Sequence, residues 1–312
     1  MIGFFAIICG FVFYFQFVNE DWKFLVPPRI LPDICKNDAE IELITHDEDF
    51  ISGRSFKDKP DKFYGNQFHT IMLLPCETKD RRFDVNLNIE SSLLAINKWL
   101  LGKTQNQKIL FDKNNKGKID ITFLRVNKTM EWFDDKNDAK KIDVSDKIKK
   151  IIFNNKNKFN NFENKKFIIF FEGWEKRKYI NYDICGKSTF RGKIAIYFIS
   201  SRFKKYIGND LILKNNKRIF TCTKDDHLND TNDLTFGNAE VTILHEMLHS
   251  LGFPSKCSKN LDINNQHVTD SEKDILHKIS GNKYLDYNND DYYNHNIKNC
   301  PDLKNKGEDI TE

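Results

Sequence analysis

The stretch from Ala239 to Gly252 reads AEVTILHEMLHSLG and holds the most informative pattern in the chain, an HExxH motif formed by His245, Glu246 and His249. Residues four positions apart lie on one face of an α-helix, one turn from each other, so both imidazoles can reach a single metal ion. Glu246 lies beside the pair, where a carboxylate can take a proton from a metal-activated water. The motif therefore predicts a zinc hydrolase site with Glu246 as its general base.

The same stretch is expected to form a buried helix. Its apolar residues recur at the 3-4-3 spacing of one helical stripe, namely Val241, Leu244, Leu248 and Leu251. Asn238 is the expected N-cap, and Gly252 is the expected residue after the helix end, where a left-handed conformation is common. The alternative is a core helix without a metal. Such a helix would have to satisfy three buried polar side chains by other means.

Length and composition fit one catalytic domain with short additions. The chain has 312 residues, of which 39% are hydrophobic and 13% are aromatic, enough to bury a full core. Its net charge is +4, and the lysines between Lys136 and Lys166 alternate with aspartates and asparagines. This pattern favours a solvated face, so no nucleic-acid partner is expected.

The N-terminus indicates export. Residues 2–18 are almost wholly apolar and are followed at once by Asn19, Glu20 and Asp21. No basic residues precede the apolar run and no small-x-small cleavage site follows it, so a cleaved signal peptide and a retained membrane anchor both stay open. We therefore expect such a segment over residues 1–20, an extension over 21–67, the catalytic domain over 68–303 and a tail over 304–312. The expected location is extracytoplasmic.

Cysteine usage agrees with export. Six cysteines follow the apolar segment, and an even number in an exported chain favours disulfides. Nearest-neighbour pairing would join Cys35 with Cys76, Cys185 with Cys222, and Cys257 with Cys300. The alternative is that a thiolate of Cys35 or Cys185 caps the zinc in a latent form.

Strands and helices alternate before the motif. Apolar patterning predicts strands over residues 68–74, 108–111, 119–126, 167–171 and 194–199. It predicts helices over residues 89–100, closed by Gly102, and over 144–159. A long polar loop is expected over residues 204–237.

This order of elements, together with a glycine-ended HExxH helix, resembles the metzincin clan of zinc peptidases and, within it, matrixin-like secreted bacterial proteins. The resemblance covers about Phe68 to Leu303. It implies an α/β (α+β) zincin fold with a mixed twisted sheet and an irregular, disulfide-linked C-terminal segment. It also implies that the strand over 193–199 is an edge strand that binds an extended protein or peptide substrate by strand addition.

The third metal ligand departs from the family pattern. In these families it follows the glycine by three residues, but that position is Ser255 here. The run HVTDSEKDILH from His267 to His277 is similar to the matrixin run that leads to a methionine turn. The similarity implies His267 as the third ligand after an insertion over residues 253–266. Leu276 would then take the place of the methionine, and His277 that of a tyrosine that could support the oxyanion. Glu272, Asp262, Asp270 and Asp274 remain alternative ligands.

The sequence thus predicts an exported zinc-dependent endopeptidase. Zn²⁺ would be held by His245, His249 and His267, with Glu246 as the catalytic base. The alternative is a catalytically silent zincin-fold binding protein of the cell envelope. The intact Glu246 argues against that alternative, and Ser255 and Leu276 argue for it.

Overall fold

The structure is a computed structural model that describes residues 34–61, 66–104, 106–134, 142–176, 183–189, 191–199, 213–214, 217–218, 228–278 and 283–306. The expected signal peptide or anchor over residues 1–20 lies outside these ranges, as do Cys222 and most of the loop expected over 204–237. Among the described helices, none combines the length and the apolar character that crossing a bilayer requires.

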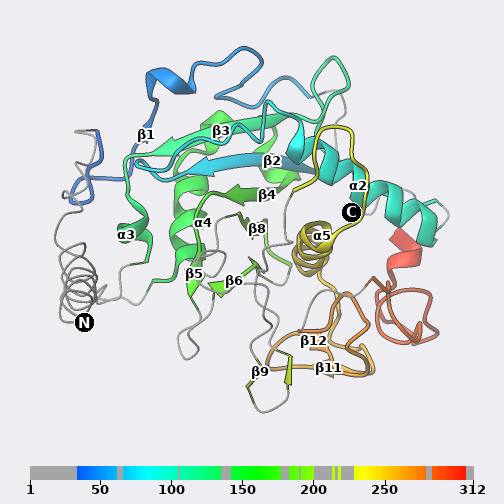
Figure 1. Cartoon of the computed structure of the whole chain (residues 1–312). Coiled ribbons are helices and arrows are strands. Elements are labelled where there is room, and N and C mark those ends of the chain that lie inside the picture. The colour runs from blue at the N-terminus through cyan, green and yellow to red at the C-terminus, as the bar shows by residue number, and fades with distance from the viewer. Residues whose placement is uncertain are drawn as a thin grey trace, which may run out of the picture.

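A six-stranded mixed sheet forms the centre of the fold, in the order β1-β3-β2-β4-β8-β7 (Figure 1). Its four inner strands are parallel: β2 (Gln67–Leu74), β3 (Ile121–Val126), β4 (Lys165–Phe171) and β8 (Ile194–Phe198). Its two edge strands, β1 (Leu43–Ile44) and β7 (Gly186–Ser188), are antiparallel to their neighbours. The α/β class and the mixed sheet are therefore confirmed. Residues 108–111 do not form the expected strand, although Phe111 makes an isolated bridge to Phe68.

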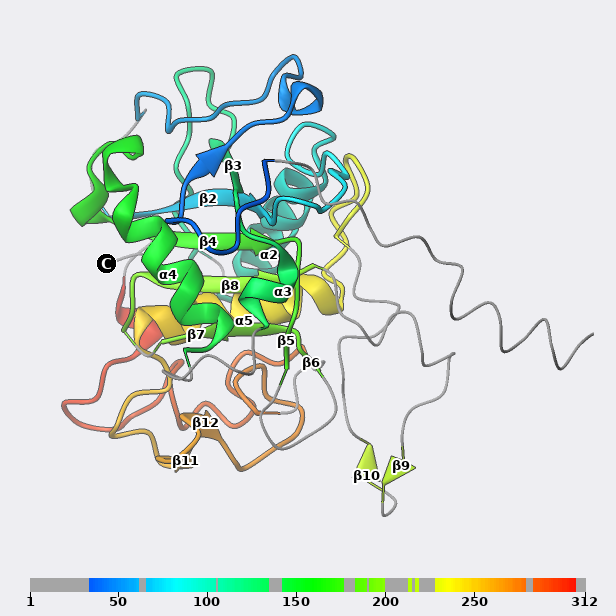
Figure 2. The ribbon, with the colours of Figure 1, turned by 90° about the vertical axis from the view of Figure 1, so that its left-hand side faces the viewer.

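Helices cover both faces of the sheet (Figure 2). One face carries α2 (Asn88–Thr104) and α5 (Asn238–Leu251), and the other carries α3 (Met130–Phe133) and α4 (Val144–Asn154). Side chains of a strand alternate between faces, so Ile168 and Phe170 of β4 pack toward α2 and α5, whereas Ile169 packs toward α3 and α4. A strand that is buried on both faces must be apolar throughout, which explains the continuous run in β4.

Two helix ends differ from the sequence expectation. Helix α2 passes through Gly102, where an added Cβ would meet no atom, and ends at Thr104, whose hydroxyl donates to the Leu100 carbonyl. Helix α4 ends five residues early because the Asn155 side chain donates to the carbonyl of Ile151. The remaining elements are short. They are the 3₁₀ turns Asp47–Asp49, Lys156–Lys158, Phe162–Asn164 and Leu303–Lys306, and the paired strands β5 (Glu175–Lys176) with β6 (Asp183–Ile184), β9 (Leu213–Lys214) with β10 (Lys217–Arg218), and β11 (Leu261–Asp262) with β12 (His267–Val268).

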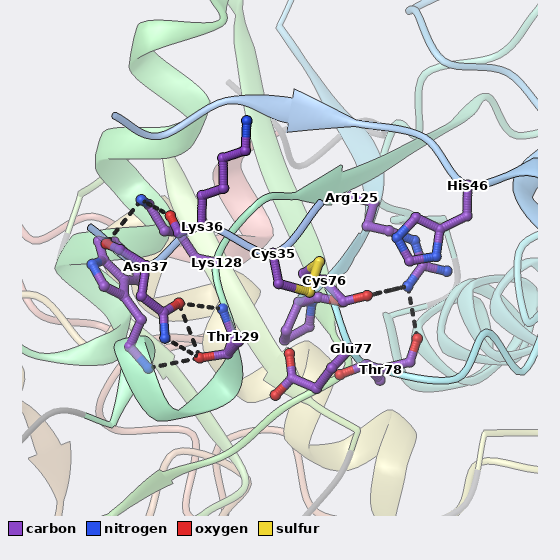
Figure 3. Close-up of a disulfide and its surroundings, with 12 residues drawn as sticks. Cys35, Lys36, Asn37, His46, Cys76, Glu77, Thr78, Arg125, Lys128 and Thr129 are labelled. Carbon is purple, nitrogen blue, oxygen red and sulfur yellow. Dashed lines mark hydrogen bonds between the residues drawn. A yellow bond between two sulfur atoms is a disulfide. The ribbon is translucent and has the colours of Figure 1, made fainter. Parts of the chain in front are cut away.

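The described part of the N-terminal extension is fastened to the sheet. Cys35 forms a disulfide with Cys76, just after β2, and the buried ammonium group of Lys128 donates to the carbonyls of Lys36 and Asn37 (Figure 3). The fully buried Arg125 forms an ion pair with Asp49 at 2.7 Å. Strand β1 belongs to the sheet, and Ile41, Leu43 and Phe56 of this extension pack against the hydrophobic cores on its two faces.

Residues 253–278 and 283–303 contain little regular structure and lie on the side of α5 that faces away from β2 and β3 (Figure 1). The Cys257–Cys300 disulfide closes this segment. Buried carboxylates take the place of secondary structure: Oδ2 of Asp286 accepts the backbone N–H groups of Asp291, Tyr292 and Tyr293. This segment packs against α5 and contacts its histidines on the side away from the sheet.

The disulfide pairs Cys35–Cys76 and Cys257–Cys300 are confirmed. Cys185 is disulfide-bonded too, and its expected partner Cys222 lies outside the described residues. A zinc-capping thiolate from Cys35 or Cys185 is therefore wrong, because both sulfur atoms are committed to disulfides.

Candidate metal centre

Helix α5 is buried along nearly its whole length because it packs between the sheet and the C-terminal segment. Its N-cap is Gly237 instead of the expected Asn238, and Oε2 of Glu240 accepts the Gly237 N–H at 2.9 Å. At the other end Gly252 adopts the expected left-handed conformation, with φ of 93°. The N–H groups of Gly252 and Phe253 bond back to the carbonyls of His249 and Leu248, which is the Schellman ending of a helix.

Three imidazoles converge at this helix. Nε2 of His245 lies 3.0 Å from Nε2 of His249 and 3.2 Å from Nε2 of His267. A tetrahedral zinc site with Zn–N bonds of about 2.0–2.1 Å separates its nitrogen ligands by about 3.3 Å. The observed separations are close to that value, so the three side chains are already arranged as one ligand set.

Hydrogen bonds on the far side of the rings fix which nitrogen faces the centre. Nδ1 of His245 lies 2.6 Å from the Ile275 carbonyl, and Nδ1 of His249 lies 2.8 Å from the Phe253 carbonyl. A carbonyl oxygen only accepts, so each Nδ1 carries the hydrogen and each Nε2 of a neutral ring presents a lone pair. Lone pairs that meet at about 3 Å repel each other unless a cation lies between them. The donor set therefore fits a metal ion, and imidazole nitrogen suits zinc.

Burial keeps these rings neutral. His245 and His249 are 4% and 6% exposed. Burial lowers the pKa of His245 to about 4 and holds the pKa of His249 well below its usual value. Neutral imidazole is the form that binds a metal, so the helix histidines are ready to act as ligands at neutral pH.

His267 reaches the centre from the hairpin formed by β11 and β12. It lies on β12, opposite Asp262 of β11, and is only partly buried. The four alternative ligands are Glu272, Asp262, Asp270 and Asp274. Among the described residues, none of them lies close enough to the helix histidines to bind the same metal ion. Asp262 bonds to its own turn through Asn264 and Asn265, and Asp274 accepts the Leu276 N–H.

Glu246 lies on the other side of the motif, against β7. It is 7% exposed, and a Cβ added to Gly186 would lie only 2.5 Å from its Cγ. Burial is the main cause that raises the pKa of Glu246 to about 8 in the metal-free protein; Glu175 raises it further and Lys187 lowers it. The Lys187 ammonium group lies 2.6 Å from Glu175 and 2.5 Å from Asp143. Lys187, on the strand β7 next to Glu246, thus forms a cluster of charged side chains with Glu175 and Asp143.

The strand over 193–199 is not the edge of the sheet, contrary to expectation. It forms β8, which pairs with β4 on one side and with β7 on the other. The edge is β7, whose three residues are Gly186, Lys187 and Ser188. A strand this short and polar carries no apolar alternation, so sequence reasoning missed it.

Ser255, Leu276 and His277, the three positions that differ from the metzincin pattern, are all buried. The Ser255 hydroxyl lies 2.9 Å and 3.0 Å from the sulfur atoms of Cys257 and Cys300, so this residue packs against the disulfide. Leu276 is fully buried in the core that it shares with α5. His277 is 7% exposed, and its charge contributes to lowering the pKa of His245.

A second group of side chains that could hold a metal ion surrounds His69 of β2. It consists of Asp58, His69, Asp112 and Asp120, all buried. The ammonium group of Lys165 lies 2.6 Å from both Asp58 and Asp112, and so supplies the positive charge that these carboxylates need. Both ring nitrogens of His69 are hydrogen-bonded within the protein, Nδ1 to Asp112 and Nε2 to Thr122.

No protein-family model and no curated protein matches this chain. Among solved structures it is similar to OgpA from Akkermansia muciniphila. The catalytically inactive form, in complex with the O-glycopeptide substrate glycodrosocin, gives a TM-score of 0.35 at 12% identity and covers 72% of this chain and 52% of that one. The wild-type form gives 0.33 at 12% identity, with 72% and 53% covered. This chain spans about half the length of that protein.

Proposed function

We propose that this protein is an exported zinc-dependent endopeptidase. The observation that carries the proposal is the convergence of three imidazole Nε2 atoms on the helix that also presents Glu246. In this proposal His245, His249 and His267 are the zinc ligands. When bound, zinc would polarise the scissile carbonyl, acidify a water molecule and favour the ionised form of Glu246.

Residues of the chain orient the ligands and transfer the proton. The Ile275 and Phe253 carbonyls hold the helix histidines in the tautomer that ligation needs. Glu246 accepts a proton from the attacking water at its carboxylate and later delivers it to the nitrogen of the leaving amine. Its burial shields that proton transfer from bulk solvent.

An extended peptide is the substrate that fits the sheet. Within the described residues β7 pairs on one side only, so its outer side can add a strand. Gly186 of this strand lies next to Glu246, because a Cβ added to it would lie 2.8 Å from Oε1 of that carboxylate. A peptide bound along β7 would therefore pass the catalytic carboxylate with its backbone extended.

Three features support a metzincin-like assignment. They are the mixed sheet, the HExxH helix with its left-handed Gly252 ending, and the buried turn over 274–277 that contacts His245. Two disulfides between described cysteines are typical of oxidising, extracytoplasmic compartments and support export.

Cleavage of an unstructured protein substrate before and after chelation tests this proposal. We expect activity to disappear when metal is removed and to return with one equivalent of zinc. A protein that binds zinc but cleaves nothing in a broad peptide library would instead fit the silent binding protein. Cleavage that survives complete metal removal would contradict both.

A further inference from the structure

A short turn from Asp274 to His277 connects two of the histidines. The Ile275 carbonyl accepts the hydrogen on Nδ1 of His245, as described above. The carbonyl of the next residue, Leu276, accepts the backbone N–H of Val268 at 3.1 Å. Val268 directly follows His267 on β12. The position of one turn therefore affects both the ring of His245 and the strand that carries His267.

The turn is held by a carboxylate and a phenol. Oδ1 of Asp274 accepts the Leu276 N–H at 2.6 Å and the Tyr292 hydroxyl at 2.9 Å. Its Oδ2 accepts the Tyr287 N–H at 2.9 Å. The Tyr292 hydroxyl also accepts the N–H of Asp286 at 2.8 Å, which connects it to the loop that Asp286 organises. Asp274 and Tyr292 are both fully buried, so no solvent replaces these contacts.

We propose that Tyr292 and Asp274 are positioning residues of the metal centre, which set its affinity and geometry through the turn over 274–277. The proposal rests on the proposed function for the identity of the metal. Neither side chain belongs to the group of three histidines that would hold the metal. Each acts through backbone carbonyls, in the way that outer partners of ligating histidines orient the ring and tune the metal.

Tyr292→Phe is the sharpest test because it removes only the hydroxyl. Tyr293→Phe is the matched control: Tyr293 is the next residue, packs against the same core, and its hydroxyl makes no hydrogen bond with a described residue. We expect Tyr292→Phe to weaken Co²⁺ and Zn²⁺ binding by about 10 to 100-fold in competition with a chelator. The visible absorption bands of bound Co²⁺ should also shift. Tyr293→Phe should match the wild type in both measurements.

Asp274→Asn gives a second test, which can be read even if the substitution lowers the stability of the fold, because each variant is compared with its own metal-free form. The rise in unfolding temperature produced by a fixed excess of zinc should be smaller in Asp274→Asn than in the wild type, because stabilisation by a bound metal increases with the logarithm of its affinity. Equal affinity, equal spectra and equal zinc-induced stabilisation in all variants would overturn the positioning role while leaving the metal site intact. Absence of metal binding in the wild type would overturn the proposed function, and the positioning role with it.

Discussion

Nε2 of His267 lies 3.2 Å from Nε2 of His245, although 22 residues separate them in the chain. The insertion between α5 and β12 thus returns to the face of the helix that carries the HExxH histidines. In the proposed site the third imidazole therefore comes from the hairpin of β11 and β12, and Ser255, three residues after Gly252, has no part in it. The Ser255 position is used to pack the Cys257–Cys300 disulfide that closes this part of the fold.

Glu246→Gln should abolish hydrolysis while leaving zinc bound. General acid–base groups contribute about 10² to 10⁴-fold to rate, and an amide cannot accept the proton of the attacking water. Peptide cleavage and zinc content are measured on the same preparation. Glu272→Gln, the same change at an exposed site, should keep full activity. Near-wild-type cleavage by Glu246→Gln would place the chemistry elsewhere.

His267→Ala should lose zinc more completely than Glu272→Ala or Asp270→Ala. Removing one of three protein ligands weakens binding by orders of magnitude, and the structure places neither carboxylate beside the helix histidines. Zinc affinity is measured by competition with a chromophoric chelator. If Glu272→Ala is the variant that releases zinc, the third ligand is not His267.

Gly186→Ala should lower the turnover rate by about 100-fold without removing zinc. Its new methyl group would lie 2.5 Å from Cγ of Glu246, and displacing a catalytic group by about 1 Å can have an effect of this size. Gly102→Ala is the control, because a methyl group there meets nothing and α2 gains helix propensity of about 1 kcal/mol at most. Equal turnover in both variants would show that Gly186 does not position Glu246.

Acid should destabilise the metal-free protein through His245. Its pKa is lowered to about 4 by burial, whereas the unfolded chain titrates near 6.5, so the unfolded state binds more protons between these values. The free energy of unfolding therefore falls as the pH drops from 6.5 through 4, by about 3 kcal/mol at most from this residue. Urea unfolding in chelator at pH 7.5 and 4.5 measures this loss.

His245→Asn is the matched variant for that measurement, because its amide can still donate to the Ile275 carbonyl but does not titrate. It should lose less stability than the wild type over the same pH interval. Identical losses would mean that His245 is not the group responsible.

Local patterns carried most of what the sequence predicted. The HExxH spacing, the apolar stripe and Gly252 all concern one helix, where neighbours in sequence are neighbours in space. The inner strands β2, β4 and β8 were predicted well because burial on both faces makes them apolar throughout.

The features that sequence reasoning missed depend on long-range packing. The edge strand β7 has the residues Gly186, Lys187 and Ser188, which show no strand pattern until β8 is beside them. The carbonyls of Ile275 and Phe253 that orient the histidines are backbone groups, which every residue has. No residue type in the sequence therefore indicates their role. His267 was found only through a resemblance, because its distance from the helix in space depends on the path of the whole insertion.

The central claim is that one zinc ion is held by three histidines, and anomalous X-ray diffraction from zinc-loaded crystals at the zinc absorption edge tests it most directly. We predict a single strong anomalous peak about 2.0–2.1 Å from the Nε2 atoms of His245, His249 and His267. A peak coordinated by a carboxylate in place of His267, or no peak at the HExxH helix, would contradict the account.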